Sequence, residues 1–245
     1  MRILSVDLAY KRWSDIGVAV LGYDQKYIKC RFIDLCDNVP DPPTADKVAA
    51  NLCNLSDKYN CKILLLDGPQ AWKHPENGHE HARDCERILN TPAKTGLPGS
   101  VKPRNYLRFV CFSIDVFNYL GQDGFRRLRY KDLEKINKVS IALESFPLAA
   151  WRSLGVTPLP AKSKCNESHI RSRVDSLLKI FPIEFNESPN HDQLQAVVAG
   201  LAGIAIRAGI SDGFEAVGQP PVSLSGIWQE GYIVNPKNWE TGKHI

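Results

Sequence analysis

The order of five short apolar segments places the strongest limit on how this chain can fold. The first three, residues 3–8, 16–21 and 27–33, are separated by only a few polar residues. Short segments at this spacing predict β-strands joined in an antiparallel meander. The other two, residues 62–66 and 139–143, follow stretches with helical character. Strands reached through helices are expected to run parallel to a neighbouring strand.

Helices are predicted between and after these strands. Apolar residues in 105–120 recur every three or four positions, and residues 45–59, 167–179 and 191–208 also have helical character. The expected fold is therefore α/β, with a five-stranded mixed sheet covered by helices. In that sheet, an antiparallel meander is extended by two parallel strands.

One domain spanning residues 1–245 is the expected organisation. Apolar residues make up 43% of the chain and charged residues 24%, as in ordinary globular domains. An insertion at about 70–104, rich in Pro, Gly, His and Asn, is expected to form a mobile flap. A C-terminal extension from about 209 is predicted to be loop-like, with Trp228 and Trp239 as anchors.

The expected location is the cytoplasm. The first residues enter a strand directly, without a long apolar leader. The longest weakly polar stretch, residues 194–206, is shorter than the ~20 residues of a membrane span. The 7 cysteines are scattered and form no CxxC pair, which predicts free thiols in a reducing compartment. A formal net charge of +4 permits a phosphate-bearing partner without requiring one.

Acidic residues occupy the predicted ends of three strands. Asp7, Asp67 and Glu144 each close an apolar segment, and Asp192 lies in the first turn of the predicted helix 191–208. Because neighbouring strands lie about 4.8 Å apart, we expect these carboxylates to cluster at one edge of the sheet.

Clustered carboxylates favour a bound cation, and hard oxygen ligands suit Mg²⁺ or Mn²⁺. Two such ions support phosphodiester hydrolysis by activating water and stabilising the leaving oxygen. Asp7, Asp67, Glu144 and Asp192 are therefore the candidate catalytic residues and metal ligands. Each also has a structural alternative, since strand-end Asp residues often form turns and first-turn acids suit a helix N-terminus.

Basic residues form a candidate surface for nucleic acid. In the insertion, Arg83 either binds a phosphate near the acidic site or pairs locally with Glu86. Two further groups of cations either neutralise phosphates or form a solvated face. The candidate substrate-binding residues are Arg83, Lys102, Arg104, Arg126, Arg127 and Arg129.

The insertion also contains His74, His79 and His81 near Cys85. A spacing of two residues between His79 and His81 does not suit a pair of zinc ligands on one helix. A polar loop is therefore favoured over a zinc site.

Several short motifs together resemble an uncharacterised family of predicted RNase H-like (RuvC-like) nucleases, the domain of unknown function 429. The resemblance covers nearly the whole chain and implies an RNase H-like fold with a nuclease-type acidic site at Asp7, Asp67, Glu144 and Asp192. It implies no particular substrate. The motifs are Asp7-Leu8-Ala9, Asp67-Gly68-Pro69, residues 83–86, Glu144-Ser145-Phe146-Pro147 with Trp151, His191-Asp192, and Glu230-Gly231.

The expected function is a Mg²⁺- or Mn²⁺-dependent nuclease that cleaves nucleic acid by a two-metal mechanism. A kinase of related fold is disfavoured because Asp7 is followed by Leu8-Ala9-Tyr10-Lys11 rather than by glycines and hydroxyls, and the chain holds one copy of the fold. The remaining alternative is a non-catalytic module that binds nucleic acid or protein through Trp13, Trp72 and the basic runs.

Overall fold

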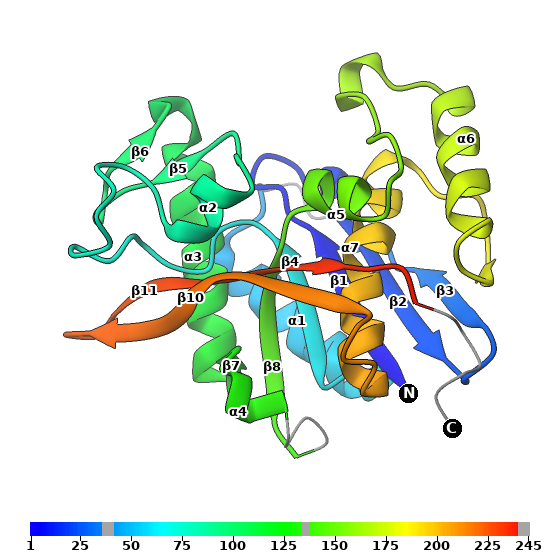
Figure 1. The fold of residues 1–245 in the computed structure, drawn as a ribbon, viewed down its shortest axis with the longest axis horizontal. Helices are drawn as coiled ribbons and strands as arrows, with labels where there is room; N and C mark the ends of the chain where they lie inside the picture. Colours follow the sequence, from blue (N-terminus) through cyan, green and yellow to red (C-terminus); the bar gives the residue numbers. More distant parts are fainter. Residues whose placement is uncertain (36–41, 134–137, 240–245) are drawn as a thin grey trace.

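A mixed β-sheet forms the centre of the molecule in the computed structural model, which describes residues 1–35, 42–133 and 138–239 (Figure 1). Among these residues the sheet has 9 strands, in the order β10-β11-β8-β4-β1-β2-β3-β9, and β7 also pairs with β8. The strands are β1 (Arg2–Asp7), β2 (Gly17–Tyr23), β3 (Ile28–Phe32), β4 (Ile63–Asp67), β7 (Phe125–Arg127), β8 (Ser140–Ser145), β9 (Ile183–Phe185), β10 (Phe214–Leu224) and β11 (Ile227–Pro236); β5 (Lys94–Thr95) and β6 (Val101–Lys102) form a separate hairpin.

The five strands expected from the sequence occupy the middle of this sheet. Strands β1, β2 and β3 pair antiparallel in succession, β4 lies parallel to β1, and β8 lies parallel to β4. The mixed topology, a meander extended by two parallel strands, is therefore confirmed. The limit of five strands is wrong, because β9 extends the sheet beyond β3, while β7, β10 and β11 extend it beyond β8.

The C-terminal segment forms a long hairpin, so the prediction of a loop-like extension is also wrong. Strands β10 and β11 pair through most of their length and turn at Ser225 and Gly226, both with positive φ. Positive φ at two central residues matches the right-handed twist of a two-residue hairpin turn. Pro220 and Pro221 lie at a register shift between Gln219 and Val222, where the ladder requires no amide donor from them.

Helices cover both faces of the sheet and define two cores (Figure 1). The apolar helix α7 crosses one face, and α1 and α3 pack together on the other. The helices are α1 (Ala45–Tyr59), α2 (Asp84–Ile88), α3 (Leu107–Gln122), α4 (Tyr130–Leu133), α5 (Pro147–Ser153), α6 (Glu167–Leu178) and α7 (His191–Ala208), with 3-10 turns at Trp13–Asp15, Arg104–Tyr106 and Lys162–Lys164.

Helix α7 lies close to the strands at two of its glycines. A Cβ at Gly200 would lie 2.2 Å from a methyl carbon of Leu21, and a Cβ at Gly203 would lie 2.3 Å from one of Leu65. These contacts leave no room for a side chain.

In the described part of the chain, no helix combines the length and apolarity that a membrane crossing requires.

Candidate functional site

Asp7 and Asp67 lie side by side at the ends of two parallel strands. They are partners in the register of β1 and β4, and their side chains are hydrogen-bonded to each other. Burial raises the pKa of Asp7 well above its usual range, and the charges of Asp67 and Asp192 raise it further. Burial also raises the pKa of Asp67, which Glu144 raises further, while the Asp7 hydrogen bond opposes both. Such a pair favours a shared proton or a bound cation.

The start of α7 brings Asp192 to this pair. Asn190 caps the helix through reciprocal hydrogen bonds with Gln193, which fixes where the first turn begins. Gly17, the register partner of Asp7, allows the close approach: a Cβ there would lie 2.2 Å from the backbone carbonyl of Asp192. The absence of a side chain at position 17 therefore allows the short distance between α7 and β2.

His191 joins the same group, although the sequence singled it out only as part of a motif. Asp7, His191 and Asp192 each offer a ligand atom, and these atoms all lie within 4.8 Å of one another. His191 Nδ1 lies 2.8 Å from Asp192 Oδ1, and its Nε2 lies 3.1 Å from the Pro160 carbonyl oxygen.

This geometry suits a metal ligand. When the Nε2–H of His191 donates to the Pro160 carbonyl, Nδ1 carries no hydrogen and is an acceptor. It then faces Asp192 Oδ1, which is also an acceptor. Two acceptors at this distance attract each other only when a proton or a cation lies between them. Ligands about 2.1 Å from an octahedral ion lie about 3 Å apart, close to the observed separation. His191 is therefore a candidate ligand together with Asp7, Asp67 and Asp192.

Two further observations describe the surroundings of this acidic group. Ser145, the register partner of Asp67, is buried, and its hydroxyl has no hydrogen-bond partner. An unpartnered buried hydroxyl beside carboxylates fits a missing ion or water. Lys162 contributes an ammonium, which pairs with Asp192 and lies 2.7 Å from Asp15 Oδ1. The group can thus be partly neutralised by the protein itself.

Glu144 lies on the other face of the sheet, so the expected cluster of four carboxylates is not complete. Its register partner is Leu66, which belongs to the core under α1 and α3, whereas Asp67 points toward α7. Side chains alternate between faces along a strand, and β8 continues one residue past Glu144. The group that could hold an ion among the described residues consists of Asp7, His191 and Asp192; Glu144 does not belong to it, and Asp67 adjoins it only through Asp7.

Glu144 is instead bound by Arg83. Two nitrogens of the Arg83 guanidinium donate to the two carboxylate oxygens of Glu144, at 2.7 and 2.6 Å. The backbone N–H of Gln70 donates to one of these oxygens at 2.9 Å. Burial raises the pKa of Glu144, and Arg83 opposes that shift. Arg83 also pairs with Glu86, which accepts hydrogen bonds from the amide and hydroxyl of Thr95. We refer to Arg83, Glu86 and Glu144 as the buried ion network.

The buried ion network fastens the insertion to β8. Arg83 is only 1% exposed, so it is not a phosphate ligand at the surface; its local pair with Glu86 forms, but inside the protein. Glu230 of β11 provides a second attachment, accepting hydrogen bonds from the amides of His74 and Asp84 and from the Asn77 side chain. These contacts tie the insertion down at two points, unlike a flap attached only at its ends.

The other basic candidates divide by exposure. Lys102, Arg104, Arg126 and Arg129 are exposed, as a nucleic-acid contact requires. Arg127 is buried, donates to the Gln70 carbonyl and to Asn118, and stacks over Trp228 at 4.6 Å. Arg83 and Arg127 therefore lie inside the protein rather than on a substrate-binding surface.

The histidines of the insertion do not form a metal group among the described residues. His79 lies 3.0 Å from Asp84, His81 lies 3.2 Å from Glu80, and His74 accepts from the Glu76 amide.

Comparison with known proteins adds little. No family model and no curated protein matches the chain. Several solved structures match weakly, among them two of RuvC. Thermus thermophilus RuvC has 11% identity and a TM-score of 0.42, over 85% of this chain and 97% of that one. T. thermophilus RuvC in complex with a Holliday junction substrate has 10% identity and a TM-score of 0.38, over 85% and 96%. Similarity at this level carries no functional argument, and the family assignment stays a prediction.

Proposed function

We propose that this protein is a metal-dependent phosphodiesterase that acts on nucleic acid, with Mg²⁺ or Mn²⁺ as the cofactor. The observation that carries the proposal is the convergence of Asp7, Asp67, His191 and Asp192 at the ends of β1 and β4 and the start of α7. Three carboxylates and an imidazole gathered at a sheet rim are costly without a cation. The unpartnered hydroxyl of Ser145 supports a polar occupant there.

The residues divide into ligands and residues that position them. Asp7, Asp192 and His191 would hold the ion, and Asp67 would hold or orient it from the neighbouring strand. Pro160 orients the imidazole of His191 through its carbonyl. When bound, the ions would supply an activated water and stabilise the leaving oxygen.

The remaining charged residues act around this centre. Glu144 was a candidate ligand, and in this proposal it positions the insertion through Arg83 instead. Lys162 is half-exposed and adjoins Asp192, so its ammonium can turn from the carboxylates to a substrate phosphate when an ion neutralises the acids.

The direct test combines metal binding with cleavage. Mn²⁺ titration followed by electron paramagnetic resonance should show binding to the parent protein, at least tenfold weaker binding to Asp7→Asn, and unchanged binding to Asp175→Asn, an exposed control on α6. Labelled single- and double-stranded DNA and RNA, incubated with Mn²⁺, should be cleaved by the parent and by the control but not by Asp7→Asn. Tight Mn²⁺ binding that is unaffected by Asp7→Asn would refute the assignment.

One observation favours a second candidate, a non-catalytic binding module. The ion pairs of Lys162 with Asp15 and Asp192 neutralise part of the acidic group without any metal. In that case Lys162→Met should destabilise the protein in chelator, and no Mn²⁺ binding should be detected. The nuclease proposal expects instead that Lys162→Met leaves Mn²⁺ binding intact and impairs cleavage.

A further inference from the structure

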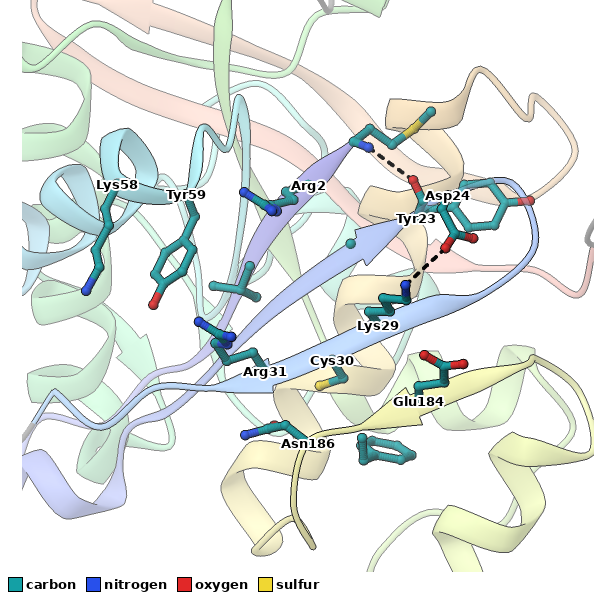
Figure 2. A pocket seen from close by; sticks show the side chains of 14 residues that line it. Arg2, Tyr23, Asp24, Lys29, Cys30, Arg31, Lys58, Tyr59, Glu184 and Asn186 are labelled. Carbon is teal, nitrogen blue, oxygen red and sulfur yellow. Dashed lines mark hydrogen bonds and ion pairs between the residues drawn. The ribbon is translucent and has the colours of Figure 1, made fainter.

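A basic groove lies at the Arg2 end of β1 (Figure 2). The acidic group lies at the other end of this strand, where Asp7 is. Its volume is about 780 Å³, and four cationic side chains line it. Arg2 comes from β1, Lys29 and Arg31 from β3, and Lys58 from the end of α1. Asp7 is five residues along β1 from Arg2, roughly 17 Å away at the rise of a strand.

The sheet register explains why these cations share one face. Arg2 and Lys29 are both register partners of Gly22, and Arg31 is the partner of Val20. Val20 belongs to the core under α1, so Arg2, Lys29 and Arg31 project on the α1 face. Helix α1 ends at Tyr59, and Gly22 adds no side chain to the floor of the groove.

Most of the positive charge in the groove is unpaired. Two carboxylates also line the groove: Asp24, which pairs with Lys29 at 3.4 Å, and Glu184, the register partner of Lys29 on β9. Arg2, Arg31 and Lys58 form no ion pair with any carboxylate of the described residues. Figure 2 shows the guanidinium groups of Arg2 and Arg31 directed into the same space. Like charges that converge without a partner raise the affinity of the site for an anion.

We propose that the basic groove binds the phosphodiester backbone of a nucleic-acid strand. The cations come from three separate elements along an open trough, whereas a compact phosphate ligand is typically held by amides of a helix N-terminus or a glycine-rich loop. Here the floor is sheet, whose backbone groups are paired across β1, β2 and β3. The Tyr59 ring, which lines the groove and lies 5.4 Å from Lys58 Nζ, offers a surface on which a base can stack.

The identity of the ligand as nucleic acid rests on the proposed function, but the affinity of the groove for phosphate does not. Arg2 projects on the α1 face and Asp7 on the α7 face, so a strand that reached both would have to pass around the rim of the sheet, over more than the ~17 Å length of β1. The groove would therefore hold a flank of the substrate, away from the bond that is cleaved.

The test measures binding without cleavage. Fluorescence anisotropy of a labelled 20-nucleotide single strand, in chelator and at several salt concentrations, is compared between the parent and Arg2→Gln/Arg31→Gln/Lys58→Gln. We expect at least tenfold weaker binding. The slope of log K against log salt should become shallower by about 2, since each phosphate contact contributes roughly 0.7. Lys47→Gln, at the other end of α1, is the control for charge and should lower affinity less than twofold.

A variant that should strengthen binding controls for loss of affinity through misfolding. Asp24 lines the groove and pairs with Lys29, and it accepts turn hydrogen bonds that Asn can keep. Asp24→Asn should therefore strengthen binding by about threefold and steepen the salt slope. Inorganic pyrophosphate, added as a competitor, should displace the strand only at millimolar concentration.

Three outcomes would overturn the proposal: unchanged affinity and slope in the triple variant, an equal loss in Lys47→Gln, or tight pyrophosphate binding with no affinity for the strand. Cleavage with Mn²⁺ separates the two proposals. If the parent cleaves while the triple variant binds normally, the groove assignment fails and the nuclease assignment stands. If the triple variant loses binding while the parent never cleaves, the groove assignment stands alone.

Discussion

The substitution Gly17→Ala tests whether the close approach of α7 to β2 creates the acidic site. The added Cβ would lie 2.2 Å from both the carbonyl carbon and the oxygen of Asp192, and 2.6 Å from the Gln193 nitrogen. Ordinary contacts between such atoms are about 3.5 Å or longer. The first turn of α7 must therefore move by at least ~1 Å, since all three contacts are with backbone that cannot rotate away.

Two effects should follow from this displacement. Overpacking of a close contact costs about 1–3 kcal/mol of unfolding free energy. Displacement of Asp192 and His191 from Asp7 should weaken Mn²⁺ binding at least tenfold, which corresponds to about 1.4 kcal/mol. Catalytic geometry is more sensitive still, because a misplacement of about 1 Å can reduce turnover by roughly a hundredfold.

Gly22→Ala is a matched control on the same strand. Its Cβ would meet its nearest neighbours at 3.7 Å, which is ordinary contact. Calorimetric melts in chelator and Mn²⁺ titration of both variants decide the question. If Gly17→Ala binds Mn²⁺ as tightly as the parent does, Asp192 and His191 are not ligands of the ion. If Gly17→Ala and Gly22→Ala unfold at the same temperature as the parent, the close approach itself is refuted.

Three more predictions concern the buried charges. Asp7→Asn should be at least as stable as the parent in chelator at pH 7.5, because it removes a half-buried carboxylate beside Asp67, and thermal melts with millimolar Mn²⁺ should reverse the order. Burial raises the pKa of Asp7 and of Asp67, so the folded state holds protons that the unfolded state releases. The free energy of unfolding of the metal-free parent should therefore fall as pH rises from about 4 toward 7. Urea titrations should show a flatter pH dependence for Asp7→Asn. Arg83→Met should cost about 3–5 kcal/mol by leaving Glu86 and Glu144 without a cation, and Arg83→Met/Glu144→Gln should recover part of that loss; equal stability of the single and double variants would contradict the pairing.

The strand order and the meeting of Asp7 with Asp67 could be predicted because both depend on local pattern. Each acid directly follows an apolar run, and parallel neighbours end at the same rim. The hairpin of β10 and β11 was missed because proline and glycine interrupt its alternation. The Ser225-Gly226 dipeptide was the available signal for a turn.

The buried arginines were missed for a different reason. The polar segment around Arg83 and the run of cations around Arg127 give no sign that these arginines lie inside the protein, because the partners that hold them there include residues far away in sequence. Glu144 is 61 residues from Arg83, and Gln70 is 57 residues from Arg127. A charge run is normally a solvated face, and only tertiary partners reverse that expectation.

The position of Glu144 shows how one residue of strand length decides the role of a carboxylate. The apolar run of β8 ends at Leu143, which places Glu144 where Asp7 and Asp67 lie on their strands. Since β8 continues through Ser145, the residue beside Asp67 is a serine, and Glu144 turns to the face covered by α3 and the insertion. The same sheet edge therefore carries two groups of charges on opposite faces, which adjoin at a cavity lined by Asp67, Ser145 and Glu144. On the α7 face, carboxylates and His191 meet with too little positive charge, which is the condition for binding a cation. On the opposite face, Arg83 neutralises Glu144, and that site holds the insertion rather than an ion.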